Sequence, residues 1–468
     1  MGKSKRILAA FLAAAMMVSL VACGEETEER SDSSTSPNDS SSGQNVIDGN
    51  ILDSKYSDDW IIDKSKYEGK TLTVWAWWDV SEADRERTIG IFEERTGAKV
   101  DWQVLSWADY PTQLVTAVSG GSGPDICYVG LEHMPAYAIK NIMLPVSDYL
   151  DYDTAPITIS PGGRDAYTYK GKVYGLTSIP DSHKLFYRKS AFQNLGIEDP
   201  RDIFERGEWT WDKFLEVGRE LTYDSDGDGA TDKYAYWSWN TFQWFTSNSA
   251  SFISYDETGT PYFSMGEPNA LEALQMIRDM DSANGVYKIT APWMVDHAPD
   301  TDLISGRIAM NYTNDSYIGD MNNEGFRSQM GDDLGFVPCP LGPSYTGSNR
   351  TADQGGTLGE CIGAGSDNPE LAVLFMLLKT APRNAEDEKE LAEKAAELQL
   401  YKYEDQAGID LANEMAMNSV FNLAGGYNKL QTIVDNIIND SSATPAQAVE
   451  ANRAAAENQI AKVLSDSE

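Results

Sequence analysis

Short apolar runs alternate with amphipathic stretches along the N-terminal third of the chain. The run at Leu72–Trp77 predicts a strand. A helix capped by Ser81 and ended by Gly97 should follow it, because apolar residues recur at helical spacing between these two positions. Lys99–Val104 then predicts a second strand.

The same alternation continues towards residue 130. Asp109–Ser119 predicts a helix that ends at a glycine pair, and Asp125–Val129 predicts a third strand. Strand, helix, strand, helix and strand in this order predict an α/β layer with parallel pairing. The glycine-rich segment 120–124 follows a helix and not a strand, so we interpret it as a turn and not as a dinucleotide-binding loop.

Two further helices begin at clear caps. Thr210 precedes a helix whose apolar residues face inward, and we therefore assign the neighbouring Trp209 and Trp211 to packing. Near the C-terminus, Thr444 and Gln447 match a capping box.

Composition excludes several classes of protein. Hydrophobic residues make up 41% of the 468 residues and aromatic residues 10%, which is enough for a large core. Lys and Arg number 37 against 73 Asp and Glu, so the formal net charge is −36, which disfavours nucleic acid as a partner. Three scattered histidines and four cysteines without a CxxC pair predict neither a zinc ribbon nor a redox pair. We expect the cysteines after residue 23 to be buried free thiols, with a Cys339–Cys361 disulfide as the alternative.

The N-terminus has the anatomy of a secretory signal. A basic start at residues 3–6 precedes the uncharged run 7–22, which is too short for a comfortable membrane span. The run ends in Leu-Val-Ala-Cys23, which looks like a bacterial lipobox. We therefore predict that residues 1–22 are a lipoprotein signal peptide and that Cys23 is diacylated, with an ordinary signal peptide as the alternative.

The segment after Cys23 is predicted to be a tether. Residues 24–50 contain no aromatic residue and only Val46 and Ile47 as sizeable apolar side chains, which is too little to offset the entropy of ordering. We assign residues 23–65 to the lipidated cysteine and a flexible Ser/Asp-rich tether. The protein should then stand on the extracellular face of the cell membrane, with the periplasm as the alternative location.

Six segments carry a resemblance to a known family. They are FEERTGAKV at 92–100, GGSGPDICYV at 120–129, YKGKVYGLTSIPDSHKLFYRKSAF at 169–192, GEWTWDKFLEVGRELT at 207–222, SGRIAMNYTND at 305–315 and GAGSDNPELAVLFMLLKTA at 363–381. In this order and spacing the chain resembles the extracellular solute-binding proteins of ABC importers, family 1, over residues 70–465.

The resemblance implies the type II fold of periplasmic binding proteins. Two α/β lobes, each a mostly parallel sheet flanked by helices, are joined by hinge crossovers and hold the ligand in the cleft between them. The implied boundaries are 66–181 with 350–405 for lobe 1, and 182–349 with 406–468 for lobe 2.

Residues 224–232 (DSDGDGATD) resemble a calcium-binding loop. With Asp224 as position 1, acids occupy positions 1, 3, 5 and 9 and glycine position 6, as in an EF-hand. Position 12 is Ala235 in place of the bidentate glutamate. Some members of the resembled family carry such a loop, so we predict a structural Ca²⁺, with a solvated turn as the alternative. The predicted ligands are Asp224, Asp226, Asp228, Asp232 and the backbone carbonyl of Ala230.

Seven of the twelve residues in Tyr234–Phe245 are aromatic. Aromatic planes pack on the C–H faces of sugars, whereas amides and carboxylates pair with sugar hydroxyls. Alternation along a strand should send about half of these aromatic residues to the core. The family pattern places binding residues soon after this strand, and the predicted contacts are Trp237, Trp239, Asn240 and Trp244.

Other predicted contacts follow strands at the carboxyl edge of a sheet, where open α/β sheets bind ligands. Each has a capping or surface role as its alternative. Their neighbour His183 is assigned to a turn. The predicted contacts are Trp77, Trp78 and Asp79 after the first strand, Glu132 after the third, Asp181 at the first crossover, and Asn314, Asp315 and Tyr317 after a strand over Ala309–Thr313.

The resemblance implies a substrate-binding lipoprotein that holds a mono- or oligosaccharide and delivers it unchanged to a membrane permease by hinge closure. The expected partners are the carbohydrate, the ABC permease subunits and the membrane through the lipid alone, with no catalytic residues. A surface glycan-processing enzyme remains an alternative, because it also needs aromatic residues and two carboxylates. A carbohydrate sensor that uses the same cleft is the other alternative.

Overall fold

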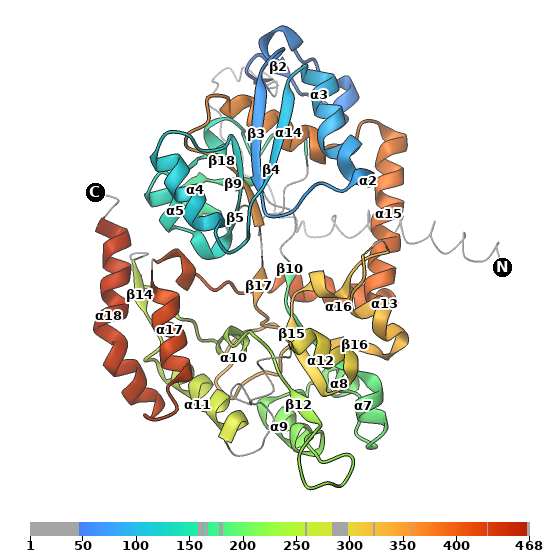
Figure 1. The fold of residues 1–468 in the computed structure, drawn as a ribbon, viewed down its shortest axis with the longest axis vertical. Coiled ribbons are helices and arrows are strands. Elements are labelled where there is room, and N and C mark those ends of the chain that lie inside the picture. Colours follow the sequence, from blue (N-terminus) through green and yellow to red (C-terminus); the bar gives the residue numbers. More distant parts are fainter. Residues whose placement is uncertain are drawn as a thin grey trace, which may run out of the picture.

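The computed structural model describes residues 46–157, 164, 167–176, 181–257, 260–282, 298–321, 323–356, 358–427 and 429–465. Its elements form two α/β lobes, one above the other in Figure 1. The short strands β10 (Asp181–Ser182) and β17 (Gly355–Gly356) pair with each other between the lobes. The two-lobed α/β fold that the resemblance implies is confirmed.

Lobe 1, the upper lobe in Figure 1, is built on one mixed sheet. Strand β3 is parallel to both β4 and β5, as the alternation of strands and helices predicted. A π-helical turn, Glu86–Gly90, joins the first two helices. The strands, in sheet order, are β4 (Lys99–Val104), β3 (Thr71–Ala76), β5 (Ile126–Gly130), β18 (Leu358–Gly363) and β6 (Met143–Leu144), with β9 (Gly175–Leu176) also paired to β18; the helices are α2 (Glu82–Arg85), α3 (Ile91–Thr96), α4 (Tyr110–Ser119), α5 (Ala136–Ile139) and α14 (Pro369–Thr380).

Lobe 2 has a four-stranded sheet with helices around it, among them the two C-terminal helices of the chain. Thr444 and Gln447 form the predicted capping box at the start of the last helix. The strands, in sheet order, are β12 (Tyr234–Tyr236), β15 (Ile308–Thr313), β11 (Lys184–Arg188) and β16 (Leu334–Val337); the helices are α7 (Lys189–Gln193), α8 (Pro200–Glu205), α9 (Trp211–Glu220), α10 (Phe242–Thr246), α11 (Pro268–Ser282), α12 (Pro299–Ser305), α13 (Phe326–Met330), α16 (Gln406–Met417), α17 (Leu430–Asn439) and α18 (Pro445–Ser465).

The remaining elements are short hairpins and one long helix. Helix α15 (Ala385–Tyr403) runs along one side of the molecule from lobe 1 to lobe 2 (Figure 1). The hairpins are β1 (Val46–Ile47) with β2 (Asn50–Ile51), β7 (Thr168–Tyr169) with β8 (Lys172–Val173), and β13 (Ile253–Tyr255) with β14 (Pro261–Phe263).

The prediction of mostly parallel sheets is confirmed, and among the described strands a single one in each lobe's sheet runs against the others. Strand β18 is antiparallel to β5, β6 and β9, and β11 is antiparallel to both β15 and β16. The reason is the path of the chain. A strand that enters a lobe directly from the other lobe starts at the edge where the parallel strands end, so it must run in the opposite direction.

Each lobe has an apolar core. In lobe 1, the apolar run Leu371–Leu378 lies within α14, and all of its eight side chains are buried. In the part of the chain that the structure describes, no helix has the length and apolar character needed to cross a bilayer. The core of lobe 2 collects Trp209 and Trp211, which confirms their assignment to packing.

The tether prediction is wrong for residues 46–65. Leu52 and Trp60 are buried in the lobe 1 core, and the backbone N–H groups of Ser57 and Asp58 donate to the carbonyls of Pro382 and Arg383. Composition alone missed this segment because a few well-spaced apolar residues are enough when a preformed surface receives them. Residues 23–45, including Cys23, lie outside the described residues.

The three cysteines within the described residues are buried free thiols, as expected. Cys127 and Cys361 are register partners in the lobe 1 sheet, whereas Cys339 belongs to the core of lobe 2. The alternative Cys339–Cys361 disulfide is therefore absent.

Candidate functional site

The strand registers bring the carboxyl edges of both sheets to the β10–β17 pair. In lobe 1, Gly130 at the end of β5 pairs with Leu358, which starts β18 soon after β17. In lobe 2, Thr313 at the end of β15 pairs with Lys184, which starts β11 soon after β10, and β12 is parallel to β15. The loops that follow β3, β5, β12 and β15 therefore lie on the edge of each sheet that faces the other lobe.

On lobe 1 this edge carries a cluster of aromatic rings. Trp77 and Trp78 are half-buried, and their ring centroids lie 5.0 Å apart. The ring of Trp78 also packs 4.6 Å from that of Tyr128. Asp79 is exposed, and its carboxylate lies 3.8 Å from the Arg85 guanidinium and accepts a hydrogen bond from the Val80 amide.

Sequence analysis missed Trp107. Its side chain is 61% exposed, and its ring centroid lies 4.8 Å from that of Trp77. Trp107 follows β4 at the same carboxyl edge as the predicted residues. The strand-end rule would have found it if it had also been applied to the second strand.

Glu132 lies in a 3₁₀ turn, Leu131–His133, and is half-buried. The C-terminal part of lobe 2 comes close to it, because a Cβ atom added to Gly425 would lie only 2.8 Å from the Glu132 carbonyl oxygen. The side chain therefore lies where lobe 2 approaches lobe 1.

On lobe 2, the aromatic segment after β12 divides between surface and core. Trp239 is 64% exposed, and its ring centroid lies 5.2 Å from that of Trp237. Asn240 is half-buried, and its side-chain amide donates to the Tyr312 carbonyl at 3.4 Å. An exposed aromatic face and an adjacent amide thus lie at the edge that faces lobe 1.

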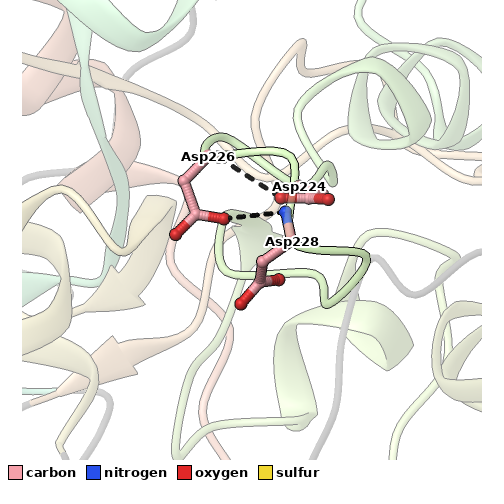
Figure 2. A group of neighbouring side chains, drawn as sticks. All are labelled: Asp224, Asp226 and Asp228. Atoms are coloured by element: carbon pink, nitrogen blue, oxygen red, sulfur yellow. Dashed lines mark hydrogen bonds between the residues drawn. The ribbon is translucent and has the colours of Figure 1, made fainter.

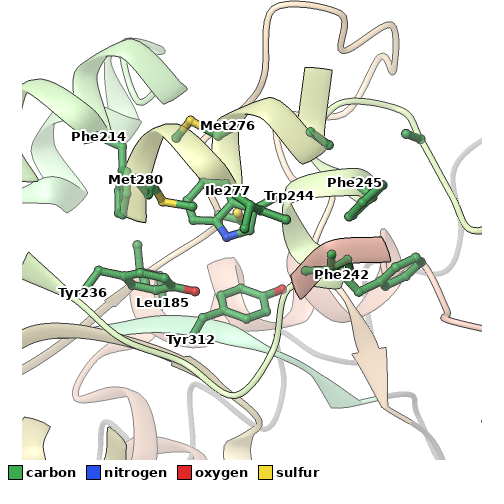
Figure 3. Close-up of a cluster of buried hydrophobic side chains, with 14 of the residues drawn as sticks. Leu185, Phe214, Tyr236, Phe242, Trp244, Phe245, Met276, Ile277, Met280 and Tyr312 are labelled. Carbon is green, nitrogen blue, oxygen red and sulfur yellow. The ribbon is translucent and has the colours of Figure 1, made fainter. Parts of the chain in front are cut away.

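Trp237 and Trp244 are each only 1% exposed. The Trp244 ring lies 5.1 Å from Phe214 and 5.8 Å from Tyr236, within the lobe 2 core drawn in Figure 3. Neither indole has a face open to a ligand in this conformation. The structure therefore assigns both to packing, the role that alternation predicted for about half of this segment.

The residues after β15 begin a 3₁₀ turn, Asp315–Ile318. The Asn314 side chain caps this turn by accepting from the Ser316 amide at 3.0 Å. Asp315 forms an ion pair with Lys184 at 2.7 Å and accepts a hydrogen bond from the Tyr403 hydroxyl. Tyr317 is 37% exposed, and its ring packs against that of Phe326. Asn314 therefore has the capping role that sequence analysis gave as its alternative. The Asp315 carboxylate is held by Lys184 and Tyr403 within the protein.

The predicted crossover residues lie where the chain passes between the lobes. The backbone of Asp181 pairs with Gly356, and the His183 amide donates to the Gln354 carbonyl at 2.8 Å. Burial, with a smaller contribution from the Lys184 ammonium, lowers the pKa of His183 to about 4. This histidine is therefore neutral at pH 7, and its imidazole ring lies stacked 5.8 Å from Tyr312.

Three carboxylates of the loop Asp224–Asp232 converge, as Figure 2 shows for Asp224, Asp226 and Asp228. One oxygen of each lies within 4.8 Å of the others. The amides of Gly229 and Gly227 donate to the Asp224 carboxylate at 2.7 Å each and hold its pKa below the usual range.

The far end of this loop differs from the predicted ligand set. The Asp232 carboxylate is turned to the amide and hydroxyl of Ser225, at 2.8 and 2.6 Å. Ala230 is exposed, and its amide donates to Asp228 at 2.8 Å. The donor set is all oxygen and fits a hard cation through its first three acids.

Two lobes that present aromatic and polar side chains towards each other across a pair of crossing strands form the architecture of a hinged binding protein. The chain belongs to the bacterial extracellular solute-binding protein family, whose model matches residues 68–385.

Curated relatives support this assignment at low identity. The chain is 25% identical over 197 residues to the diacetylchitobiose binding protein DasA of Streptomyces coelicolor, covering 42% of this chain and 39% of the relative. It is 25% identical over 187 residues to the mannitol-binding protein of Pseudomonas aeruginosa, covering 39% and 41%. The chain thus spans about two fifths of the length of these relatives.

Solved structures share the fold over most of the chain. An ABC substrate-binding protein of Listeria monocytogenes in complex with cycloalternan has a TM-score of 0.62 at 19% identity, over 85% of this chain and 98% of that protein. A solute-binding protein of Thermotoga lettingae bound with α-D-tagatose has a TM-score of 0.63 at 20% identity, over 84% and 100%.

Proposed function

We propose that this chain is the substrate-binding lipoprotein of an ABC importer. It binds a neutral mono- or oligosaccharide in a cleft between its lobes, and hinge closure presents the unchanged sugar to a membrane permease. The observation that carries the proposal is the pair of exposed indoles, Trp107 on lobe 1 and Trp239 on lobe 2, at the edges where the parallel strands of the two sheets end.

The chemistry of these edges suits a sugar. Exposed indole faces pack on sugar C–H groups, and a nearby amide (Asn240) and carboxylate (Asp79) pair with hydroxyls. The net charge of −36 disfavours an anionic ligand. Four proteins that the chain resembles are named for or solved with diacetylchitobiose, mannitol, cycloalternan and tagatose, all of which are uncharged and rich in hydroxyls.

Calorimetry of the mature chain tests the proposal with mannitol, tagatose, maltotriose and diacetylchitobiose, followed by analysis of the recovered sugar. We expect saturable binding of at least one member and recovery of that sugar unchanged. Cleaved product would favour the glycan-processing enzyme, and no heat with any member would contradict sugar binding. Loss of uptake in cells that lack the chain separates an importer component from a sensor.

We further propose that Asp224, Asp226 and Asp228 hold a structural Ca²⁺. Four acids within nine residues repel one another, and a hard cation relieves this repulsion. EDTA should lower the melting temperature of the wild type, and added Ca²⁺ should restore it. The Asp226→Ala variant should melt at the same temperature with and without EDTA. A wild type whose melting ignores EDTA would leave only the solvated turn.

The lipid anchor is part of the same proposal and rests on the lipobox at Cys23. Wild-type protein extracted from membranes should carry a diacylglyceryl group on residue 23. The Cys23→Ser variant should be recovered without lipid, whereas an unlipidated wild type would favour an ordinary signal peptide.

A further inference from the structure

Within the described residues, three segments pass between the lobes, and the third is the long helix α15. Its first turn is fixed to lobe 1, because Asp387 forms an ion pair with Arg87 at 2.5 Å. Its last turn is fixed to lobe 2, because the Arg327 guanidinium donates to the Lys402 carbonyl at 2.8 Å. The other two crossings contain β10 and β17.

Asp315 joins the first crossing to the third. One carboxylate oxygen lies 2.7 Å from the Lys184 ammonium, at the start of β11, and the other accepts from the hydroxyl of Tyr403, the last residue of α15. Lys184 is only 1% exposed, and its ammonium also donates to the carbonyl and the hydroxyl of Ser182 at 3.1 Å each. A lysine this deeply buried needs its counter-ion in place.

Tyr312, which lies on β15 three residues before Asp315, contacts the second crossing. Its hydroxyl donates to the fully buried Asp353 carboxylate at 3.2 Å and accepts from the Gln354 amide at 2.8 Å, just before β17. The Asp353 carboxylate also accepts from the Cys339 amide at 2.8 Å. The segment 312–315, which comprises the last two residues of β15 and the two that follow, thus contacts all three crossings.

We propose that the segment 312–315 is the hinge hub of this protein, and that Asp315 is a positioning residue that sets the angle between the lobes. The proposal rests on the proposed function, in which the lobes move about these crossings. Both carboxylate oxygens of Asp315 are engaged within the hinge, so the sugar contact predicted for it from the sequence is replaced by this role. Asn314 lies within the hub and Tyr317 lies two residues beyond it, so a ligand that touches them acts directly on the hinge.

The chain offers a matched control within a single lobe. Glu360 in β18 is also held by a lysine and a tyrosine, because its carboxylate lies 2.5 Å from the Lys379 ammonium and accepts from the Tyr128 hydroxyl at 2.6 Å. All three residues of this control triad belong to lobe 1 and to no crossing. Loss of its charge should affect stability without affecting the angle between the lobes.

The test measures the interlobe distance in the sugar-free mature chain, which starts at residue 23 with Cys23→Ser. Spin labels are placed at Glu94→Cys in α3 and Glu220→Cys in α9, which are both exposed, while the three native cysteines are buried. Pulsed dipolar spectroscopy then compares the wild type with Asp315→Asn, Tyr403→Phe and Glu360→Gln. Tyr403→Phe removes a single hydroxyl and serves if Asp315→Asn does not fold.

We expect at least one hinge variant to shift the mean interlobe distance or to widen the distance distribution about twofold. Glu360→Gln should keep the wild-type distribution. Unchanged distributions in both hinge variants would overturn the proposal, and so would equal broadening in Glu360→Gln. Because no sugar is present, failure here leaves the calorimetric test of sugar binding unaffected.

Discussion

The tryptophans that follow β12 illustrate how differently one residue type is used within a few positions. Trp239 has most of its side chain exposed, whereas Trp244 packs among Phe214 and Tyr236 in the core. A ligand contact contributes to the free energy of binding, whereas a core contact contributes to the free energy of unfolding. Measuring both quantities therefore distinguishes the two roles.

Trp239→Ala should therefore weaken sugar binding by about tenfold or more while changing the free energy of unfolding by less than about 0.5 kcal/mol. Trp244→Ala should lower the free energy of unfolding by about 3–5 kcal/mol because it leaves a large cavity. Calorimetry with the sugar that binds and urea unfolding measure the two quantities. Full affinity in Trp239→Ala would remove this residue from the site.

Two buried titratable residues at the crossings have pKa shifts of opposite sign. Burial raises the pKa of Asp353 from 3.8 to about 7, so its contribution to stability is complete below pH 3.8 and is lost as the pH rises towards 7. Burial lowers the pKa of His183 from 6.5 to about 4, so its contribution is complete above pH 6.5 and is lost as the pH falls towards 4. Between these values the native and unfolded chains bind the same number of protons at this pair, and the two slopes cancel.

Single variants should reveal each slope. From pH 4.5 to 6, Asp353→Asn should gain about 1–2 kcal/mol of unfolding free energy relative to the wild type, because the histidine slope remains. His183→Gln should lose a similar amount, because the aspartate slope remains. Urea unfolding at the two pH values measures both. Parallel pH profiles for all three proteins would show that these pKa values are not shifted by folding.

At the scale of elements, the local sequence pattern predicted the bounds of strands and helices whose signals are local. The strand at Lys99–Val104, the helix ended by Gly97 and the capped C-terminal helix agree with the structure because their signals lie within a few residues. The reversed direction of β11 and β18 within otherwise parallel sheets was not predicted, because it depends on where the chain enters each lobe. The folded segment 46–65 was missed because its few apolar residues are buried only by packing on the lobe 1 surface, which its own composition does not show.

Neighbouring residues in that segment test its new assignment. Trp60 is 4% exposed and its indole N–H donates to the Ser54 carbonyl at 2.6 Å, whereas the Ile61 side chain is 64% exposed. Trp60→Ala should lower the free energy of unfolding by about 3–5 kcal/mol, and Ile61→Ala should change it by less than about 0.5 kcal/mol. Urea unfolding measures both. A Trp60→Ala variant as stable as the wild type would restore the tether interpretation.

At the scale of the whole molecule, the sequence indicated which strand ends face the other lobe, where the proposed site lies, because the carboxyl edge of an α/β sheet is a topological property. It did not indicate which side chains are free to touch a ligand. Trp237 is enclosed, Asp315 is engaged by Lys184 and Tyr403, and Trp107 is exposed, and each outcome depends on packing between distant segments. The same packing between distant segments brings all three crossings into contact with the segment 312–315.

The central claim is that two lobes close around a neutral sugar and leave it intact. Small-angle X-ray scattering of the mature chain, with and without the saccharide that gives heat in calorimetry, tests this most directly when the sugar is afterwards recovered and weighed by mass spectrometry. The account predicts a smaller radius of gyration with bound sugar and an unaltered sugar mass. Superimposable scattering curves, or a sugar recovered as fragments, would contradict it.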